Sequence, residues 1–227
     1  MPTHNTRTLP DTALPLLDIT SAAACLLSGG LVLFPTETYF GIGSLTNAPQ
    51  AVDMVYQVKN RQTSHPLPMV AATQDQAAQI CLLETAPARL LDFWPGPLTL
   101  LLPCRKNCGL APRLVNRDGL VAVRVSPHPL VSRLCLETSF PLTASSANIS
   151  GQPAASQVDC LAPALLANLA MTHVPTGLLL PSLEEELPAG GAPSTIVRPL
   201  PDGRLAIHRE GAIAVSALQA AGFACIL

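Results

Sequence analysis

The sequence predicts an α/β (α+β) protein built on a mixed β-sheet, because short apolar segments alternate with segments of helical periodicity along the chain. Turn residues, mainly Pro and Gly, separate these segments. Hydrophobic residues make up 48% of the 227 residues, which is enough for one continuous core. We therefore expect a single domain over residues 18–227, preceded by an N-terminal extension over residues 1–17.

The first elements are predicted to be a helix and a buried strand. Residues 21–28 are small and mainly apolar, and Gly29-Gly30 would end a helix there. Residues 31–34 form an apolar run that Pro35 halts. A helix therefore leads into the first strand, and polar residues follow the end of that strand.

A second helix is predicted after Pro49, because Pro suits the first helical turn. Apolar residues recur in this segment at steps of three and four, which places Lys59 and Arg61 at or just beyond the helix C-terminus. The helix dipole favours cations at that end. A functional role for the two cations is therefore compatible with the predicted local structure.

The rest of the chain continues the alternation. Residues 104–119 are expected to form a long loop, and such loops are often functional. A further exposed connection is expected around the acidic residues 184–186. The remaining predicted elements are, in order, a strand at 67–72, a helix starting at Thr73, a helix from Pro87 to near Trp94, strands at 98–102 and 120–125, a helix at 130–137, a strand at 141–144, a helix at 161–170, and strands at 195–197 and 205–208.

Composition narrows the class of ligand. The formal net charge of -2 provides no general attraction to nucleic acid, so a small ligand is favoured.

No segment approaches the roughly 20 apolar residues needed to span a bilayer, so we expect no membrane association. The seven cysteines are odd in number and lie mostly in apolar segments, which indicates a cytoplasmic protein. Cys104 and Cys108 are close in sequence, but no second Cys or His pair accompanies them, so free thiols are favoured over a zinc site.

A run of hydroxyl and amide side chains marks the strongest candidate for a ligand site. Ser145-Ser146-Ala147-Asn148 and then Ser150-Gly151 follow the apolar segment at 141–144. Such turn chemistry at the end of a strand can cradle a small ligand. Only 12% of the residues are charged, and cations recur beside segments of this kind, which indicates an anionic ligand.

The cations have alternative interpretations at this stage. Arg124 lies within an apolar strand, and a buried guanidinium needs an anionic partner. That partner is either a structural carboxylate or the carboxylate of a ligand. Arg209 is either a ligand clamp or the partner of Glu210 in an ion pair. Lys59 and Arg61 either bind phosphate or form a charged surface pair at a helix end.

Other motifs are less specific. Thr36, Glu37 and Thr38 follow the first strand, and they either hold the amino and hydroxyl groups of a small polar ligand or form a solvated turn. His65 and His208 have no Ser or Cys partner at a recognisable spacing, so a hydrolytic triad has little support. The glycine patterns of P-loop and Rossmann nucleotide sites are absent from the sequence.

A series of short motifs spans nearly the whole chain. Its members are Phe34-Pro35-Thr36-Glu37-Thr38-Tyr39-Phe40-Gly41, Lys59-Asn60-Arg61, Pro66-Leu67, Trp94-Pro95-Gly96-Pro97-Leu98-Thr99, Val121-Ala122-Val123-Arg124-Val125, Ser146-Ala147-Asn148-Ile149-Ser150-Gly151, Pro193-Ser194-Thr195-Ile196-Val197 and Arg209-Glu210-Gly211. In this order the motifs resemble the YrdC-like threonylcarbamoyl-AMP synthase family in its short, single-domain form. The resemblance extends from about Ala22 to Ile213.

This resemblance implies a nucleotidyltransferase that joins L-threonine, bicarbonate and ATP into threonylcarbamoyl-adenylate and releases pyrophosphate. The product would serve the N6-threonylcarbamoylation of adenosine 37 in tRNA, and separate proteins would transfer the group to the tRNA. The resemblance also implies a YrdC-like twisted mixed sheet with flanking helices around a large, concave, cationic cavity. Mg²⁺ would be required and would be held mainly by the ATP phosphates, with no metal site made by the protein.

Roles for single residues follow from the same resemblance. Lys59 and Arg61 would be catalytic, because they would neutralise charge on the phosphates. The residues implied to bind ATP are Lys59, Arg61, Ser146, Asn148 and Arg209. The residues implied to bind threonine are Thr36, Thr38, Arg124 and Thr195, with Arg124 on the carboxylate. Whether Thr36 or Thr38 makes the main contact is left open.

Two other functions remain as alternatives. The same basic surface could hold tRNA or double-stranded RNA without chemistry, or make a weak RNA contact beside the enzymatic activity, but only 13 Lys and Arg residues are present for phosphate contacts. A YciO-like paralogue would keep the fold and use another substrate. The intact Lys59-x-Arg61 and Ser146-x-Asn148 pairs favour the synthase over the paralogue.

Overall fold

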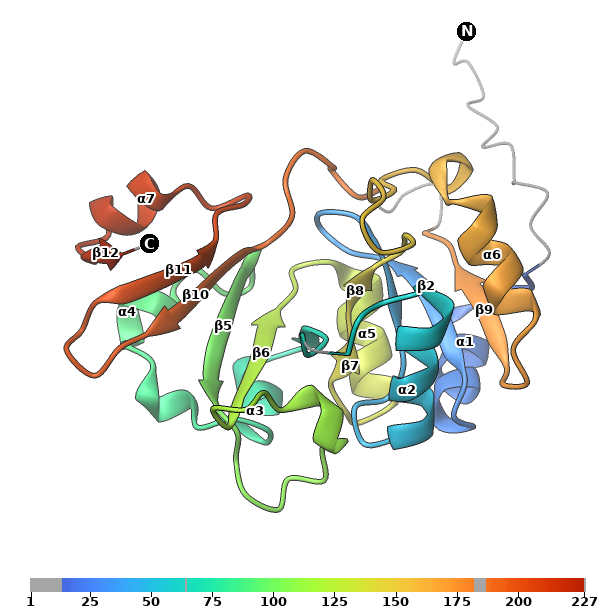
Figure 1. The fold of residues 1–227 in the computed structure, drawn as a ribbon, viewed down its shortest axis with the longest axis horizontal. Coiled ribbons are helices and arrows are strands. Elements are labelled where there is room, and N and C mark those ends of the chain that lie inside the picture. Colours follow the sequence, from blue (N-terminus) through green and yellow to red (C-terminus); the bar gives the residue numbers. More distant parts are fainter. Residues whose placement is uncertain (1–13, 64, 182–186, 227) are drawn as a thin grey trace, which may run out of the picture.

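The computed structural model describes residues 14–63, 65–181 and 187–226, which form two mixed β-sheets with flanking helices (Figure 1). The strands are β1 (Leu16–Leu17), β2 (Leu31–Pro35), β3 (Phe40–Gly43), β4 (Met69–Ala71), β5 (Leu98–Pro103), β6 (Leu120–Val125), β7 (Leu142–Thr143), β8 (Ser145–Ser146), β9 (Thr176–Leu179), β10 (Thr195–Pro199), β11 (Leu205–Arg209) and β12 (Cys225–Ile226). The helices are α1 (Ile19–Leu27), α2 (Pro49–Val58), α3 (Gln74–Ala78), α4 (Ala88–Leu91), α5 (Pro129–Glu137), α6 (Pro163–Ala170) and α7 (Val215–Ala220), with 3-10 helices η1 (Leu83–Thr85), η2 (Pro112–Leu114) and η3 (Val158–Cys160). The predicted α/β class is confirmed.

The strands divide into two sheets, where the sequence suggested one. The five-stranded sheet has the order β1-β9-β2-β3-β8, and the seven-stranded sheet has the order β12-β11-β10-β5-β6-β4-β7. Both sheets are mixed, since β2 pairs in parallel with β9 and antiparallel with β3, while β6 pairs in parallel with β4 and antiparallel with β5. The chain passes from one sheet to the other between β3 and β4, between β7 and β8 at Ala144, and between β9 and β10.

Close backbone contacts join the two sheets. Just after β3, the N–H of Ser44 donates to Oγ1 of Thr143 at 2.9 Å, and the N–H of Thr143 donates back to the carbonyl oxygen of Ser44 at 3.0 Å. Gly43 allows this approach, because a Cβ atom there would overlap the carbonyl oxygen of Thr143. The short apolar segment at 141–144 therefore forms the junction of the sheets.

Local signals explain the first elements. Oδ1 of Asp18 accepts the N–H of Ser21 at 2.7 Å and caps α1, and Gly29 follows the helix with a φ of 81°. All five residues of β2 are buried, as expected for a strand inside a sheet. β1 falls within the segment 1–17, whose first 13 residues lie outside the described part of the chain.

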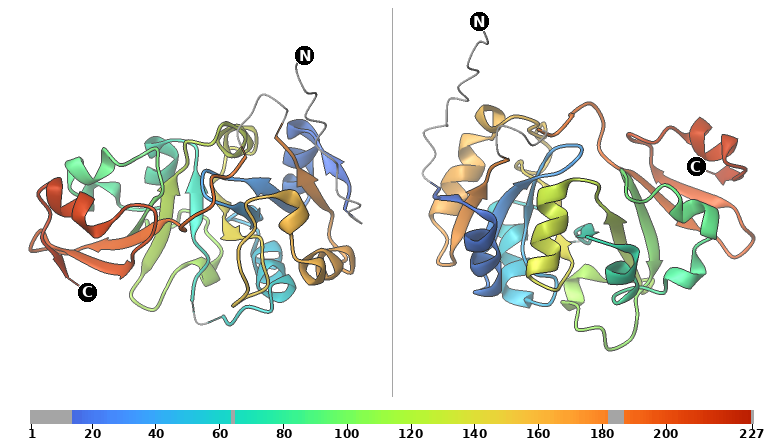
Figure 2. Two further views of the ribbon diagram at one scale, coloured as in Figure 1. Left: turned by 90° about the horizontal axis from the view of Figure 1, so that it is seen from above. Right: turned by 180° about the vertical axis from the view of Figure 1, so that it is seen from behind.

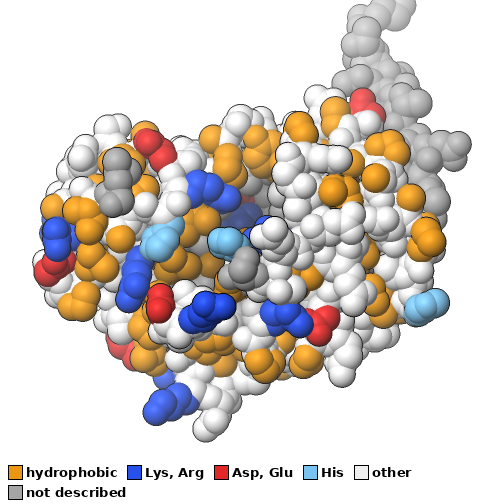
Figure 3. Space-filling view, viewed as in Figure 1, with side chains coloured by type: hydrophobic (Ala, Val, Ile, Leu, Met, Phe, Trp, Pro, Cys, Tyr) orange, Lys and Arg blue, Asp and Glu red, His pale blue; other side chains and the backbone are white. Residues whose placement is uncertain are grey.

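Helices lie on both faces of the sheets, with α2 and α6 in front of the strands in Figure 1. Seen from behind, α1, α3 and α5 lie in front of the strands (Figure 2, right). The opposite face carries a central hollow rimmed by Lys, Arg and His side chains (Figure 3). The acidic residues 184–186 lie outside the described residues. None of the helices in the described ranges is both long and apolar enough to cross a membrane.

Candidate functional site

A cavity of about 510 Å³ lies between the two sheets. Its wall is formed by the loop between β2 and β3, by β5, β6 and β8, and by the segments around β10 and β11. The lining residues are Thr36, Thr38, Tyr39, Phe40, Gly41, Arg61, His65, Pro66, Pro68, Leu101, Asn116, Leu120, Ala122, Arg124, Ala144, Ser145, Ser146, Pro193, Ser194, Ile196, His208 and Arg209. This described lining contains three arginines and two histidines but no acidic residue, so the cavity favours an anionic ligand.

The three arginines come from distant parts of the chain. Arg61 follows α2, Arg124 lies in β6, and Arg209 ends β11. The pKa of Arg209 is lowered by partial burial and by the charges of Arg124 and Arg61. The three guanidinium groups therefore act on one another electrostatically, and an anion placed among them would relieve their repulsion.

Arg61 has an unused hydrogen-bond donor. Its Nε is buried and finds no acceptor among the described residues. A buried N–H without an acceptor is costly, and such groups are rare in folded proteins. Arg61 also lines the cavity, so its guanidinium group lies where a ligand would bind, although Nε itself is buried.

One edge of the Arg124 guanidinium group is bound by a carboxylate. Its Nε donates to Oε1 of Glu37 at 2.8 Å, and Oε2 of Glu37 accepts the hydroxyl of Ser126 at 2.5 Å. Burial alone would raise the pKa of Glu37, but the Arg124 charge and the Ser126 hydrogen bond outweigh burial and hold that pKa below its ordinary value. The structural carboxylate is therefore a partner of Arg124, which nevertheless remains part of the cavity wall.

The two threonines of the loop between β2 and β3 differ in their bonding. The hydroxyl of Thr36 donates to the carbonyl oxygen of Tyr39 at 2.7 Å and accepts the N–H groups of Thr38 and Tyr39, each at 3.3 Å. The hydroxyl of Thr38 has only the Thr36 hydroxyl as a partner among the described residues, at 3.3 Å. Thr36 therefore shapes the loop, and Thr38 has the freer hydroxyl at the cavity.

Lys59 lies behind the cavity wall. It is 1% exposed at the C-terminal cap of α2, as predicted for its position in the helix, and it does not line the cavity. Its Nζ donates to the carbonyl oxygen of Ser146, to that of Asn148 at 2.6 Å, and to Oδ1 of Asn148 at 3.3 Å. Burial and the charge of Arg61 lower the pKa of Lys59 to about 7. Lys59 thus holds the Ser146–Asn148 segment in place from beneath.

Ser146 and Asn148 accept the hydrogen bonds of Lys59 and also bond to each other. The Ser146 hydroxyl donates to Oδ1 of Asn148 at 2.5 Å, and Ser146 lines the cavity, so its oxygen remains able to accept a hydrogen bond. Asn148 does not line the cavity, since its Nδ2 donates to the carbonyl oxygens of Ile149 at 3.0 Å and Gln152 at 2.6 Å. Of this pair, only Ser146 is placed to touch a ligand.

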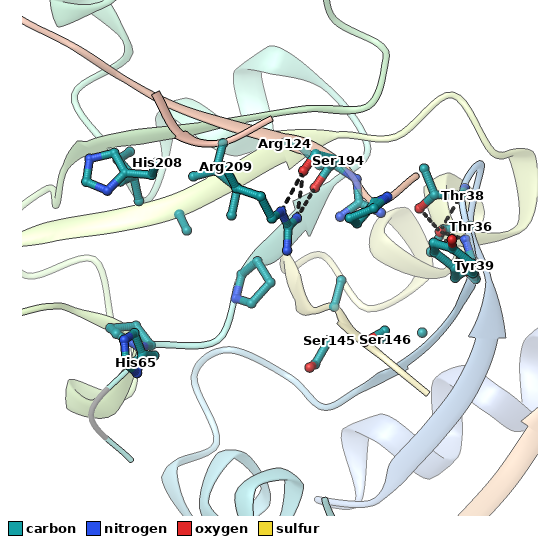
Figure 4. A pocket seen from close by; sticks show the side chains of 18 of the residues that line it. Thr36, Thr38, Tyr39, His65, Arg124, Ser145, Ser146, Ser194, His208 and Arg209 are labelled. Atoms are coloured by element: carbon teal, nitrogen blue, oxygen red, sulfur yellow. Dashed lines mark hydrogen bonds between the residues drawn. The ribbon is translucent and has the colours of Figure 1, made fainter. Parts of the chain in front are cut away.

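Arg209 and Thr195 have different positions relative to the cavity. Nε and Nη2 of Arg209 donate to the carbonyl oxygen of Ser194 at 3.1 and 2.6 Å, as Figure 4 shows. Oε1 of Glu210 instead accepts the N–H of Val215 at 2.8 Å, which favours the ligand-clamp interpretation of Arg209 over a local ion pair. Thr195 is fully buried and donates to the carbonyl oxygen of Ile213 at 2.6 Å, away from the lining.

Six of the nine sequence-predicted site residues therefore line one cavity: Thr36, Thr38, Arg61, Arg124, Ser146 and Arg209. Lys59, Asn148 and Thr195 support that wall from behind. Asn116, Ser194 and His208 also line it, although the sequence alone predicted no role for them. Ser194 could have been identified from its motif, since it stands beside Thr195. Asn116 lies in the long polar loop, where no sequence pattern distinguishes it as a site residue.

Protein ligands for a metal are sparse at this site. The described lining has no carboxylate, and Glu37 is engaged by Arg124 and Ser126. Across the described ranges, no group of three or more His, Cys, Asp and Glu side chains is placed to hold a metal ion. A divalent cation in this cavity would therefore depend on oxygen ligands brought by the substrate.

The fold and the cavity define an α/β protein with a cationic, hydroxyl-lined ligand site. The chain belongs to the Sua5–YciO–YrdC family, whose model, described as telomere recombination, matches residues 24–211. It is 39% identical over 159 residues to the threonylcarbamoyl-AMP synthase of Xanthomonas axonopodis pv. citri (strain 306), covering 67% of this chain and 83% of the relative. It is 36% identical over 164 residues to the enzyme of the same name from Bacillus subtilis (strain 168), covering 70% of this chain and 47% of the relative. The chain thus spans about half the length of the latter.

Solved structures show the same fold. P. abyssi Sua5 in complex with L-threonine matches with a TM-score of 0.73 and 25% identity, over 95% of this chain and 63% of that protein. E. coli YciO matches with a TM-score of 0.68 and 17% identity, over 89% of this chain and 96% of that protein. The likeness to YciO concerns the fold alone, so it does not separate a synthase from a paralogue.

Proposed function

We propose that this protein is a threonylcarbamoyl-AMP synthase, a nucleotidyltransferase that makes L-threonylcarbamoyl-adenylate and pyrophosphate from L-threonine, bicarbonate and ATP. The product would supply tRNA threonylcarbamoylation in the cytoplasm, through separate transfer proteins. One observation carries the proposal: three arginines and a set of hydroxyl groups line a single cavity that has no acidic residue in its described lining. The curated relatives with this name support the choice of reaction.

The cavity has two chemically different ends. Thr36, Thr38 and Tyr39 lie at one end, and His65 and His208 lie at the other (Figure 4). At the first end, Arg124 would bind the threonine carboxylate through the guanidinium edge that Glu37 leaves free, and Thr38 would bind the amino or hydroxyl group. P. abyssi Sua5 forms a complex with L-threonine, which supports a threonine site in this family.

The opposite end suits a nucleoside. Leu101, Leu120 and Ile196 provide apolar surface in the cavity lining, and Asn116 contributes an amide. A base can stack or pack on such a surface while the amide donates a hydrogen bond. The ATP phosphates would then lie between the two ends, where Arg61 and Arg209 supply charge and Ser146 offers its lone pairs to a ribose hydroxyl.

The arginines address the main barrier of the reaction. The threonine amine and bicarbonate first combine into an N-carboxylate with loss of water. A carboxylate oxygen then attacks the α-phosphorus, the bond to the β-phosphate oxygen breaks, and pyrophosphate leaves with the electron pair. Both reactants are anions, so the guanidinium groups would lower their repulsion and stabilise the charge that builds up on the leaving group. Mg²⁺ would enter with ATP as part of the substrate.

In this proposal Lys59, Asn148 and Thr195 do not touch the substrates but hold residues that do. Lys59 would act by holding the Ser146–Asn148 segment, and Thr195 by holding the segment at 211–213 behind Arg209. Direct phosphate contact is assigned to Arg61, because Arg61 lines the cavity and Lys59 does not. The proposed catalytic group is therefore Arg61, with Lys59 as a positioning residue.

The test is pyrophosphate release by the purified protein with MgATP, measured with and without L-threonine and bicarbonate. We expect release only when all three substrates are present, together with an adenylate of the expected mass. Pyrophosphate release that ignores threonine would contradict the proposal in favour of a paralogue. No release, combined with RNA binding that weakens steeply as salt increases, would favour an RNA-binding module without enzymatic activity.

A further inference from the structure

A pair of thiols lies outside the cavity, at the start of the loop that follows β5. Sγ of Cys104 is 3.7 Å from Sγ of Cys108, and neither residue lines the cavity. Both side chains are free thiols. Sγ of Cys104 is also 3.5 Å from the carbonyl oxygen of Arg105. In the described ranges, the sulfurs of four other cysteines, Cys25, Cys81, Cys135 and Cys225, contact backbone carbonyl groups and no second sulfur. The loop therefore brings two sulfurs together in a way that the rest of the described chain does not.

The backbone fixes this arrangement. The N–H of Cys104 donates to the carbonyl oxygen of Gly119 at 2.8 Å, and Cys104 forms an isolated β-bridge with Cys81. Asn107 and Gly109 adopt left-handed conformations, with φ of 57° and 78°. Two such residues on either side of Cys108 turn the chain back, so that Cys108 returns toward the anchored Cys104.

The pair is accessible to solutes. Cys104 and Cys108 are half-buried, whereas Cys25, Cys81 and Cys135 are buried. Lys106 is exposed within the same turn, and Arg105 stands beside it. Cations beside the pair attract anionic reagents. A negatively charged, low-molecular-weight disulfide such as oxidised glutathione can therefore reach the pair.

We propose that Cys104 and Cys108 form a reversible thiol–disulfide site, which is oxidised by a low-molecular-weight disulfide. The Cys108 thiolate attacks one sulfur of the oxidant, whose S–S bond breaks and releases one thiol. The Cys104 sulfur then attacks Cys108 Sγ, loses its proton to solvent and releases the second thiol. The two cysteines are oxidised by two electrons and the oxidant is reduced by two. Side-chain rotation must shorten the separation from 3.7 Å to about 2.05 Å.

The order of attack follows from the environments of the two thiols. Burial, together with the hydrogen bond and charge of Cys108, raises the pKa of Cys104 to about 11. Cys104 therefore remains protonated at neutral pH and suits the second, resolving step. Reversibility agrees with a reducing compartment, in which disulfides are transient. The same loop carries Asn116 and Leu120 to the cavity wall, so the site lies at the base of a functional segment.

Trypsin provides a direct test, because Arg105 and Lys106 place cleavage sites between the two cysteines. The full chain is treated with oxidised glutathione, its remaining thiols are blocked with iodoacetamide, and the digest is analysed by mass spectrometry. We expect the peptide ending at Arg105 and the peptide starting at Asn107 to remain joined, and to separate after treatment with dithiothreitol.

The controls are Cys104→Ser, Cys108→Ser and the exposed Cys160 of the wild-type chain. Each variant should lose the joined peptides and carry glutathione on its single remaining thiol, as Cys160 should in the wild type. Separate glutathione or iodoacetamide adducts on both Cys104 and Cys108 of the wild type would overturn the proposal. This result does not depend on the proposed enzymatic function.

Discussion

Glu37 and Arg124 are separated by 87 residues in the sequence but form a buried ion pair, with Glu37 Oε1 2.8 Å from Arg124 Nε. The two side chains are 12% and 5% exposed. Glu37 lies in the loop between β2 and β3 of the five-stranded sheet, and Arg124 lies in β6 of the seven-stranded sheet. The pair therefore connects the two sheets and fixes the orientation of the guanidinium at the cavity.

Replacing Glu37 should affect threonine use more than ATP use. In Glu37→Gln the charge of Arg124 loses its partner, so we expect the free energy of unfolding to fall by about 3 kcal/mol. The KM for threonine should rise about tenfold, with a small change in the KM for ATP. Steady-state kinetics and urea unfolding measure both effects. Ser126→Ala keeps the ion pair and should cost only about 1 kcal/mol. Equal increases of both KM values in Glu37→Gln would show that Glu37 does not act through Arg124.

Replacing Thr36 should mainly lower the stability of the protein, whereas replacing Thr38 should mainly lower its affinity for threonine. Thr36→Val removes a hydroxyl that bonds three backbone groups, so we expect a loss of about 1 to 2 kcal/mol in unfolding free energy. Thr38→Val should leave stability nearly unchanged and lower the affinity for threonine about tenfold. Calorimetric titration with threonine and urea unfolding of both variants test this assignment. The reverse pattern would make Thr36 the ligand contact.

Arg61 should contribute to nucleotide binding through the shape of its guanidinium as well as its charge. Arg61→Lys keeps the charge but removes the fork that includes the unpaired Nε. We expect the KM for ATP to rise about tenfold while the KM for threonine stays near the wild-type value. Arg117→Lys is the matched control, because Arg117 is exposed and does not line the cavity. Unchanged ATP kinetics in Arg61→Lys would remove Arg61 from the phosphate site.

Lys59 should give the protein a pH-dependent stability. The folded-state pKa is about 7, below the ordinary value of 10.5, so between these values the unfolded chain binds a proton that the folded chain has lost. The stability of the wild type should therefore increase with pH in that window. Relative to Lys59→Met, we expect a gain of about 2 kcal/mol from pH 6 to pH 8.5. Urea unfolding across this range measures the difference. Parallel stability curves would mean that the three oxygen acceptors keep the ammonium charged.

Much of the fold was predictable because local chemistry marks it. Gly29 ends α1, Pro49 starts α2, and the apolar runs became β2, β5 and β6. The short strands β3 and β9 were missed, because they contain glycines and few residues to establish a period. The position of Lys59 at a helix end was also predicted from periodicity, but its burial was not.

The sequence by itself determined which chemical groups are present and which local elements carry them: the arginines, the hydroxyl-rich segment after β7 and the α/β class. Only the tertiary structure decided which groups share a site. The division into two sheets places Arg61, Arg124 and Arg209 around one cavity and turns Lys59 away from it. The physical reason is that the partners of buried charges are chosen by packing between distant segments. Glu37 neutralises Arg124 across 87 residues, a relationship that no local pattern encodes.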